Sequence, residues 1–409
     1  MRILIYGLNF APELTGIGKY TGELAKFLVD NGHDVHVITT PPYYPQWRVT
    51  NGYSSTRYQI STVGVIKIIR CPIWVPQKPS GVKRLLHLTS FAISSLPVGL
   101  AELFWKPDVI FSVAPTLFCG PFALILSKLS GAKSWLHIQD FELDAAFSLG
   151  VLPARDVLHK IATKFESSIF RGFDRVSTIS SNMQGKLIEK GADPSKTELL
   201  VNWVDTEVIF PLNRSSPLRR ELGFSENTQI ILYAGNLGKK QNLDILIDVA
   251  KDFPPALDVM FVLVGAGSAR HDLKSKASGL KNIKFFPLQP SNRLNDLLNL
   301  ANIHILPQQR NAADLVMPSK LSAIIASGRP VIASAQPGTE VYKIVENVGI
   351  VVPPEDQCAL SDAIQKILCN MKHYVSLAEL GRAYAINNWD KRSVLRDFKV
   401  QIENLATQS

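Results

Sequence analysis

Residues 235–267 read GNLGKKQNLDILIDVAKDFPPALDVMFVLVGAG, and this stretch decides the fold. A glycine turn that carries Lys239 and Lys240 follows a predicted strand, an apolar helix begins directly after it, and the strand Val259–Val264 completes the unit. Backbone N–H groups and lysine charges then meet at a helix N-terminus, which is where an anionic ligand binds. The stretch therefore predicts a Rossmann-like half with a phosphate-binding turn.

The chain begins in a related way. The predicted strand Arg2–Tyr6 leads into residues 10–19, FAPELTGIGK, and a second helix follows. Two Rossmann-like halves of the chain, each with a loop suited to bind phosphate, indicate an enzyme that holds a nucleotide-linked substrate between two domains. At 409 residues the chain is too long for one core and predicts two domains, with the break near residues 202–205.

Strands alternate with helices along the whole chain, which is typical of doubly wound parallel sheets in an α/β protein. We expect strands near residues 2–7, 34–39, 63–70, 108–113, 133–138, 174–179, 197–201, 229–234, 257–264, 282–286, 302–306, 330–334 and 349–352.

Composition places the chain among folded globular proteins, with 46% apolar and 19% charged residues. The four cysteines form no CxxC pair and no cluster with histidines, so we expect reduced thiols rather than disulfides or a metal site. The first residues lack the basic start and long apolar core of a secretory signal. These features indicate a cytoplasmic protein.

The net charge of +9 is concentrated between Pro41 and Lys106, where basic residues alternate with aromatic ones and Glu102 is the one acid. Such a window is found in proteins that bind nucleic acid, in proteins that contact anionic membranes, and on soluble positively charged faces. Residues 85–101 carry no formal charge, but serines, Pro97 and a glycine interrupt the apolar run. This favours a helix half buried in a domain core over a membrane span, with a helix in the membrane interface as a third interpretation.

Two segments of the first half carry candidate site residues. Gly16–Gly18 lets the backbone approach a ligand closely, although taken alone a tight turn after a strand is the better explanation. No dinucleotide fingerprint is present. His137 and Asp140 lie at the carboxyl end of a predicted strand, the edge where open α/β sheets bind ligands. The acids Asp140, Glu142 and Asp144 lack a histidine partner at ligand spacing, so we expect no metal there.

The second half adds two loops at strand ends. Ser319 and Lys320 fall in the first turn of a predicted helix, where a lysine opposes the helix dipole and an anion would offset it. Gly338-Thr339-Glu340 opens another helix, although an acid in a first turn is also ordinary helix chemistry. Each loop alone is a weak signal. Because all of them follow strands, together they predict one ligand-binding edge.

These segments resemble the glycosyltransferases of family 4, which have the GT-B fold, and within them the enzymes of colanic-acid and O-antigen type. The resemblance covers essentially the whole length, and the aromatic-proline segments between Pro41 and Gly81 are its most specific part. It is carried by FAPE at 10–13, TGIGKY at 15–20, PPYYPQW at 41–47, CPIWVP at 71–76, PSG at 79–81, HIQD at 137–140, NWVD at 202–205, GNLGKKQ at 235–241, MPSK at 317–320 and ASGRP at 326–330.

The resemblance implies two Rossmann-like, doubly wound parallel-sheet domains that face each other across a cleft. Residues 1–203 would bind the acceptor, residues 204–389 would bind the nucleotide-sugar donor, and a helix at 390–409 would pack back on the first domain. The implied activity is retaining hexosyl transfer from a nucleotide diphosphate. No metal or other cofactor is expected, because fixed N–H groups, helix N-termini and a lysine can stabilise the leaving diphosphate.

Carried over to this sequence, the resemblance makes Gly18, His137 and Lys240 the catalytic residues. The loop Gly16–Gly18 would donate N–H bonds to the diphosphate, His137 would lie beside the transferred sugar, and Lys240 would neutralise the phosphates. The other implied substrate-binding residues are Gly16, Ile17, Lys19, Asp140, Asn236, Gly265, Asp314, Ser319, Lys320, Gly338, Thr339 and Glu340.

Two departures from the family pattern affect the donor. Many members have arginine where this chain has Asn236, and lysine where it has Gln241. The family's pair of glutamates would fall at Leu315 and Ala323, and neither residue is acidic. Two alternatives stay open: their loss reduces activity, or Asp314 and Lys320 replace them, with Lys320 on the phosphate. The nucleotide is therefore left open between UDP and GDP, with an N-acetyl amino-deoxysugar or fucose as the sugar.

The acceptor implied by the resemblance is a polyprenyl-diphosphate-linked saccharide of exopolysaccharide or O-antigen (lipopolysaccharide) biosynthesis, at the inner face of the cytoplasmic membrane. The basic-aromatic window would then contact anionic lipids, at roughly 1 kcal/mol per cation, rather than nucleic acid. Two other functions stay open. One is a nucleotide-sugar epimerase or hydrolase of the same fold, and the other is a catalytically weak assembly subunit of a polysaccharide complex.

Overall fold

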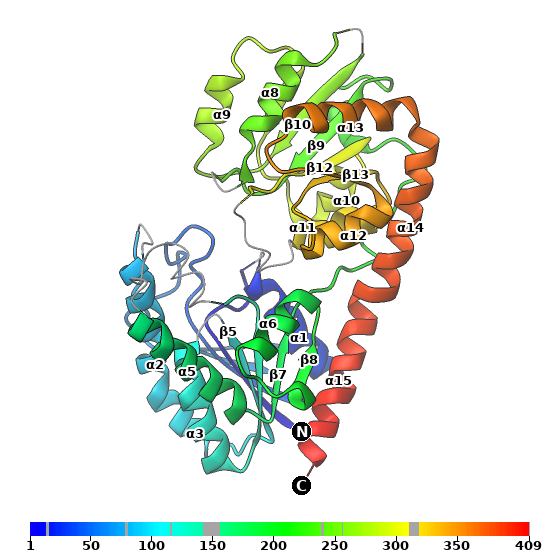
Figure 1. Cartoon of the computed structure of the whole chain (residues 1–409). Coiled ribbons are helices and arrows are strands. Elements are labelled where there is room, and N and C mark those ends of the chain that lie inside the picture. Colours follow the sequence, from blue (N-terminus) through cyan, green and yellow to red (C-terminus); the bar gives the residue numbers. More distant parts are fainter. Residues whose placement is uncertain are drawn as a thin grey trace. The chain divides into compact units, whose positions relative to one another are not determined.

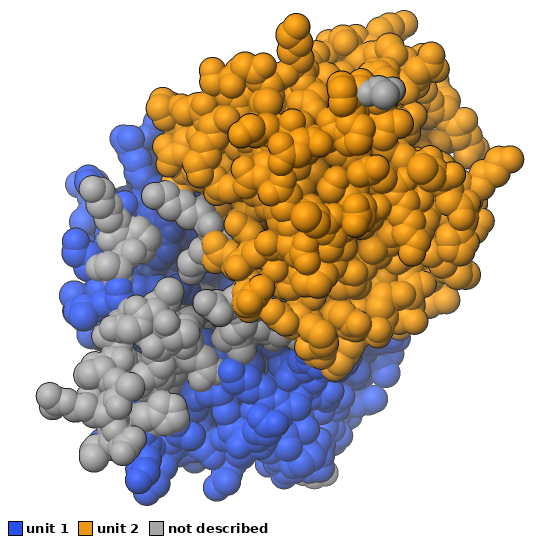
Figure 2. Space-filling model, turned by 45° about the horizontal axis from the view of Figure 1, so that its top comes forward, with its two compact units in different colours: residues 1–202, 394–409 blue, residues 203–393 orange. Residues whose placement is uncertain are grey.

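The computed structural model describes residues 1–13, 16–77, 81–114, 117–141, 156–238, 241–255, 257–310 and 319–408. The chain divides into two compact units, residues 1–202 with 394–409 (unit 1) and residues 203–393 (unit 2), which Figure 2 shows in different colours. It passes from unit 1 to unit 2 between Asn202 and Trp203 and returns at Val394, inside the last helix.

Unit 1 is built on an eight-stranded sheet of order β3-β4-β2-β1-β5-β6-β7-β8, with α2, α3 and α5 on one face and α1 and α15 on the other (Figure 1). Its strands are β1 Arg2–Gly7, β2 Asp34–Thr39, β3 Gln59–Val63, β4 Ile66–Arg70, β5 Val109–Ala114, β6 Lys133–Ile138, β7 Arg175–Thr178 and β8 Thr197–Leu199. Its helices are α1 Ile17–Asp30, α2 Gly81–Glu102, α3 Gly120–Ser130, α5 Asp156–Gly172, α6 Ser181–Glu189 and α15 Lys391–Thr407, with short η1 Leu117–Cys119 and η2 Pro194–Lys196.

One strand departs from the predicted parallel pattern. The single strand expected at 63–70 is instead the pair β3 and β4, which a turn at Gly64 joins and which pair antiparallel at the edge of the sheet. Ile60 and Val63 of β3 are 69% and 62% exposed. β3 was missed because an exposed edge strand lacks the continuous apolar run that marks a strand covered on both faces.

The two faces of the unit 1 sheet bury different helices. Tyr6 of β1 packs against Phe91 of α2, with ring centroids 5.8 Å apart. On the other face Phe111 and Trp135 each contact Phe398 of α15, at 5.1 Å. Burial of these large rings is the main force that holds the C-terminal half of α15 on unit 1.

Unit 2 has a six-stranded, all-parallel sheet of order β11-β10-β9-β12-β13-β14. One buried cluster joins the sheet to α8, α9 and α13, and a second joins it to α7 and α10. Its strands are β9 Gln229–Ala234, β10 Val259–Val264, β11 Ile283–Phe286, β12 Ile303–Leu306, β13 Val331–Ser334 and β14 Ile350–Val352. Its helices are α7 Pro217–Glu221, α8 Asp244–Asp252, α9 Arg270–Lys276, α10 Leu294–Leu298, α11 Ser319–Ala326, α12 Glu340–Val348, α13 Gln357–Cys369 and α14 Met371–Trp389, with the short η4 Ser291–Arg293.

The strand orders locate the binding edges. In unit 2 the direction of winding reverses between β9 and β12, and in unit 1 it reverses between β1 and β5. Open α/β sheets bind ligands at such reversals, beyond the carboxyl ends of the strands. The loops that follow β1 and β9 are therefore the places to look for a site, and both are loops that the sequence singled out.

Candidate active site

The glycine loops after β9 and β10 in unit 2 are in direct backbone contact. Gly235 and Gly265 have φ values of 146° and 151°, a region that side chains rarely adopt. A Cβ on Gly265 would lie 1.8 Å from the carbonyl oxygen of Gly235. No side chain fits at position 265, and the φ of Gly235 is one that only glycine adopts readily, so both positions favour glycine.

Hydrogen bonds hold the two loops together. The N–H of Leu237 donates to the carbonyl of Ala266 at 2.8 Å, and the N–H of Ala269 donates to the carbonyl of Leu237 at 2.9 Å. The Tyr233 hydroxyl donates to the carbonyl of Asn236 at 2.7 Å. Asn236 itself is exposed at the tip of the loop. The loop is thus a fixed backbone surface that a ligand can approach closely.

Lys320, in the first turn of α11, reaches over this surface. Its Nζ donates to the Tyr233 hydroxyl at 2.7 Å and lies 4.6 Å from the centroid of that ring. A Cβ on Gly235 would lie 2.3 Å from Lys320 Cε, so the lysine occupies the space that the glycine leaves open. Burial lowers the pKa of Lys320 to about 8. A partly desolvated cation held this way against a glycine backbone is suited to bind an anion.

The structure describes some of the other predicted site residues of unit 2 and not others. Gly338 has a φ of 85°, and Thr339 is the N-cap of α12: its hydroxyl accepts from the N–H of Tyr342 and donates to the carbonyl of Gln336. Glu340 follows in the first turn of the same helix. The backbone of Ser319 begins α11. Lys240 and Asp314 lie outside the described residues, so their roles stay predictions.

In unit 1 the predicted loop is organised by a residue that the prediction left out, Glu13. Its carboxylate accepts from the N–H groups of Tyr43 and Tyr44, both at 3.0 Å, and from the Asn9 amide at 2.9 Å. A Cβ on Gly18 would lie 2.7 Å from Glu13. Glu13 therefore joins the loop after β1 to the loop after β2 and requires glycine at position 18.

Arg70 supports the same loop from the end of β4. Its guanidinium donates to the carbonyls of Thr40 and Ala11, at 2.8 and 2.6 Å, and its charge lies close enough to Glu13 to favour the ionised carboxylate. Burial is the larger influence and raises the pKa of Glu13. Gly16 is the exposed N-cap of α1 with a φ of 61°, and Ile17 and Lys19 fall in the first turn.

His137 is held in the protein interior. It is 4% exposed, and its Nδ1 and Nε2 lie 2.9 Å from the Ser177 hydroxyl and the Gln139 amide nitrogen. Gln139 and Asn202 exchange two amide hydrogen bonds, which orients the Gln139 nitrogen toward the histidine. The ring is therefore neutral with its proton on Nδ1, and burial lowers its pKa to about 3. The role of His137 beside a sugar stays a prediction.

Asp140, two residues beyond the end of β6, is more accessible. Its carboxylate lies 3.9 Å from the guanidinium of Arg84, in the first turn of α2, and its side chain is 30% exposed. The ligand-binding edge of unit 1 is thus linked to α2. Among the described residues, no group of three or more histidine, cysteine or acidic side chains could hold a metal ion.

Comparison with known proteins identifies the chain. Residues 15–203 match the family described as Glycosyl transferase 4-like domain, and residues 215–384 match Glycosyl transferases group 1. The chain is 43% identical to WcaI of Escherichia coli strain K12, to which a role as a colanic acid biosynthesis glycosyl transferase is attributed, across 97% of this chain and 98% of that protein. This chain belongs to the family 4 glycosyltransferases.

Solved structures show that this glycosyltransferase has the GT-B fold. Sucrose-phosphate synthase from Thermosynechococcus elongatus aligns with a TM-score of 0.78 at 17% identity, covering 100% of both chains. HepE of Anabaena, solved in complex with UDP-glucose, aligns with a TM-score of 0.70 at 16% identity, covering 99% of this chain and 100% of that one. At sequence identities this low, the similarity shows the fold alone.

Sequence reasoning missed two structural supports of the glycosyltransferase's loops, Glu13 and Tyr233. Glu13 stood in the motif at 10–13 that carried the resemblance, and an acid directly between a proline and a glycine loop was a usable signal. Tyr233 lies inside β9 and gave no signal, because its partners Lys320 and Asn236 are set by the packing of α11 on the loop.

Proposed function

We propose that this glycosyltransferase transfers a hexosyl group with retention from a UDP- or GDP-linked sugar to a polyprenyl-diphosphate-linked saccharide, in the synthesis of an exopolysaccharide or lipopolysaccharide. The donor binds unit 2 and the acceptor binds unit 1. WcaI, its relative at 43% identity, has a colanic acid role attributed to it, which supports the polysaccharide class. The metal-independence and the membrane attachment described below belong to the same proposal.

The observation that carries the donor assignment is the cradle formed by Gly235, Gly265 and Lys320. It holds a cation, whose pKa burial lowers to about 8, against a glycine backbone at the strand reversal of the sheet. A diphosphate suits this arrangement, because it brings negative charge to a desolvated ammonium group. The HepE structure with UDP-glucose supports the same class of donor.

Exposed aromatic rings support a saccharide acceptor on unit 1. Tyr44 is 43% exposed and its ring lies 3.8 Å from where a Cβ of Gly16 would be. Trp74 is 46% exposed, and its carbonyl accepts from His87 Nδ1 at 2.7 Å. Flat apolar faces beside the loop after β1 are suited to pack against the C–H face of a sugar ring.

Helix α2 supports attachment to a membrane surface. It is the one helix of the described chain that is long and apolar enough to cross a membrane, and 33% of its apolar window is buried. Its buried face is anchored in unit 1, since Ser95 bonds Tyr6 at 2.6 Å and Glu102 pairs with Lys67. A helix fixed on its own sheet favours a surface contact over a span.

The outer face of α2 is apolar. Val82, Leu86, Ile93, Leu96 and Leu100 are 37–63% exposed and recur at helical spacing, and Phe104 just beyond the helix is 92% exposed. The one acid of the basic window, Glu102, is buried, so the exposed charges of that window are all positive. An apolar stripe among cations is suited to the head-group layer of an anionic bilayer.

The proposed activity is tested with the purified protein, a panel of nucleotide sugars and a bacterial lipid extract. We expect one UDP- or GDP-sugar to raise the melting temperature and to label a lipid product whose new linkage keeps the donor's anomeric configuration. Donor turnover without a lipid product indicates a hydrolase or epimerase and contradicts the proposal, and so does a product with inverted configuration.

Transfer is expected to need no divalent metal, because Lys320 already supplies a positive charge that can offset the charge of the leaving diphosphate. Activity should survive excess EDTA nearly unchanged. A loss that magnesium or manganese restores would show that the cation is required. Heat-treated enzyme in the same buffers serves as the control for donor hydrolysis.

Attachment to anionic vesicles is expected to depend on both the apolar stripe and the charge. Flotation with phosphatidylglycerol vesicles should fall as salt rises, because exposed charges are screened within about 10 Å at 0.1 M salt. Leu100→Asp should weaken binding at least about tenfold, since it places a carboxylate in the interface. Val400→Asp on α15, where the valine is 51% exposed against 47% for Leu100, should have no effect. Equal flotation of both variants would contradict the assignment of α2.

A further inference from the structure

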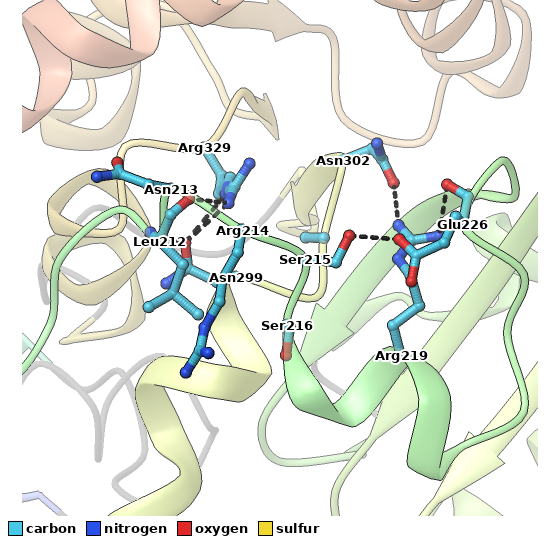
Figure 3. Close-up of a pocket in the computed structure, with 11 residues that line it drawn as sticks. Leu212, Asn213, Arg214, Ser215, Ser216, Arg219, Glu226, Asn299, Asn302 and Arg329 are labelled. Atoms are coloured by element: carbon cyan, nitrogen blue, oxygen red, sulfur yellow. Dashed lines mark hydrogen bonds between the residues drawn. The ribbon is translucent and has the colours of Figure 1, made fainter.

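A polar cavity of about 300 Å³ lies entirely within unit 2, away from the donor cradle (Figure 3). It is lined by residues that precede strands, among them Asn302 before β12 and Arg329 before β13. The cradle is built on residues that follow strands. In a parallel sheet these are opposite edges, so the cavity is a separate site and its interpretation does not depend on the activity proposed above.

Arg219 supplies a fixed positive charge at the back of the cavity. It is 7% exposed, and its Nη1 donates to the carbonyls of Ser225 and Thr228, both at 2.7 Å. Its Nη2 donates to the Asn302 side-chain oxygen at 3.0 Å. These acceptors hold the guanidinium still but leave most of its charge in place, because carbonyl and amide oxygens carry no formal charge.

Arg329 brings a second guanidinium to the same cavity. It donates to the Asn299 side-chain oxygen from Nε and Nη2, at 3.1 and 3.0 Å, and from Nη2 to the carbonyl of Leu212 at 3.3 Å (Figure 3). Burial lowers the pKa of Arg329, and the charge of Arg219 lowers it further. Two arginines thus repel each other across a site that an anion would stabilise.

The other charged residues of the lining determine the net charge of the cavity. Arg214 is exposed at the rim, on the segment that leads from the unit boundary into α7. Glu226, the single acid of the lining, is exposed and accepts a hydrogen bond from the Ser215 hydroxyl. The three arginines outnumber Glu226 and Asp258, whose charges both act on Arg219, so the cavity keeps a net positive charge that favours an anion.

We infer that this cavity binds a phosphate monoester, as a second anion site of the enzyme distinct from the donor site. Arginine forks and phosphate oxygens form paired charge-assisted hydrogen bonds, and small polar groups such as Ser215 complete the lining. The cavity volume of about 300 Å³ is at the lower end for ligand sites and suits a small phosphorylated metabolite rather than a nucleotide sugar.

The test uses calorimetric titration of the full-length protein with inorganic phosphate. A Lys320→Ala background removes the cation of the donor cradle, so that binding there does not mask the second site. We expect one saturable phosphate site in this background. Arg214→Ala should weaken it about fivefold, and Arg329→Gln should weaken it at least about tenfold, because each removes a charge-assisted contact.

Arg220→Ala is the matched control, since Arg220 is an exposed neighbour on α7 that does not line the cavity. It should leave phosphate affinity unchanged. Circular dichroism reports whether Arg329→Gln folds; if it does not, Arg214→Ala decides, because an exposed arginine can be removed without loss of the fold. Absence of a saturable site, or equal affinities for Arg214→Ala and Arg220→Ala, overturns the inference.

Discussion

Replacing Lys320 by methionine is expected to weaken donor binding by roughly 10- to 100-fold, the loss of one charge-assisted contact of about 1.5–3 kcal/mol. The lysine lies over Gly235 with its Nζ 2.7 Å from the Tyr233 hydroxyl, and no other described residue places a cation there. Methionine keeps the length of the side chain and its packing. The effect therefore reports the charge and not a cavity.

The same replacement is expected to make the unliganded protein more stable. The pKa of Lys320 is lowered to about 8 by burial, from an ordinary value of 10.5. Between these two pKa values the unfolded chain binds more protons than the folded chain, so folding stability rises with pH across this window. Below pH 8 the lysine is charged in both states, and the full cost of burying the charge is present. Methionine removes that cost, which is about 3 kcal/mol at neutral pH.

The pH dependence of donor affinity is opposite in sign to that of folding stability. In the complex the diphosphate restores the charged lysine, so binding takes up a proton above pH 8 and affinity should fall as pH rises from 8 toward 10. Lys320→Met should lose this slope. Lys281→Met changes an exposed lysine of the same unit and should alter neither affinity nor slope. Donor affinity equal to that of the wild type in Lys320→Met would rule out the cradle as the diphosphate site.

The fold was predictable where buried residues form a recognisable apolar pattern in the sequence. Strands covered on both faces, such as β1 and β10, read as continuous apolar runs and were found at nearly their observed bounds. β3 was missed because it is exposed along almost its whole length, so neither alternation of apolar and polar residues nor a continuous apolar run marks it. Edge strands are defined by pairing with a neighbour, and pairing is not encoded locally.

The candidate site was predictable as a set of loops but not as contacts. Glycines after strands and a lysine at a helix start pointed to the carboxyl edge of the sheet, because the carboxyl ends of parallel strands share one edge. The sequence could not show that Lys320 lies against Gly235, since the two are brought together by the packing of α11. Nor could it show that His137 is enclosed by Ser177 and Gln139, which lie on β7 and beyond the end of β6.

Gly265→Ala is expected to have the second large effect, a loss of about 3 kcal/mol or more in the free energy of unfolding together with loss of donor binding. The new Cβ would lie 1.8 Å from the Gly235 carbonyl oxygen, and this neighbour is backbone that cannot rotate away. Either the loop after β9 or the loop after β10 must move. Since Leu237 and Ala266 are hydrogen-bonded across them, a shift of one loop breaks the cradle.

The matched control is Gly279→Ala, which separates the clash from the cost of the backbone conformation. Gly279 also has a positive φ, 86°, but nothing lies within 4 Å of where its Cβ would be. Alanine there should cost only the conformational strain, about 1 kcal/mol, and should leave donor affinity unchanged. Urea unfolding and donor titration of both variants give the comparison. If Gly265→Ala is no more destabilised than Gly279→Ala and still binds donor, the two loops do not form the close contact on which the cradle depends.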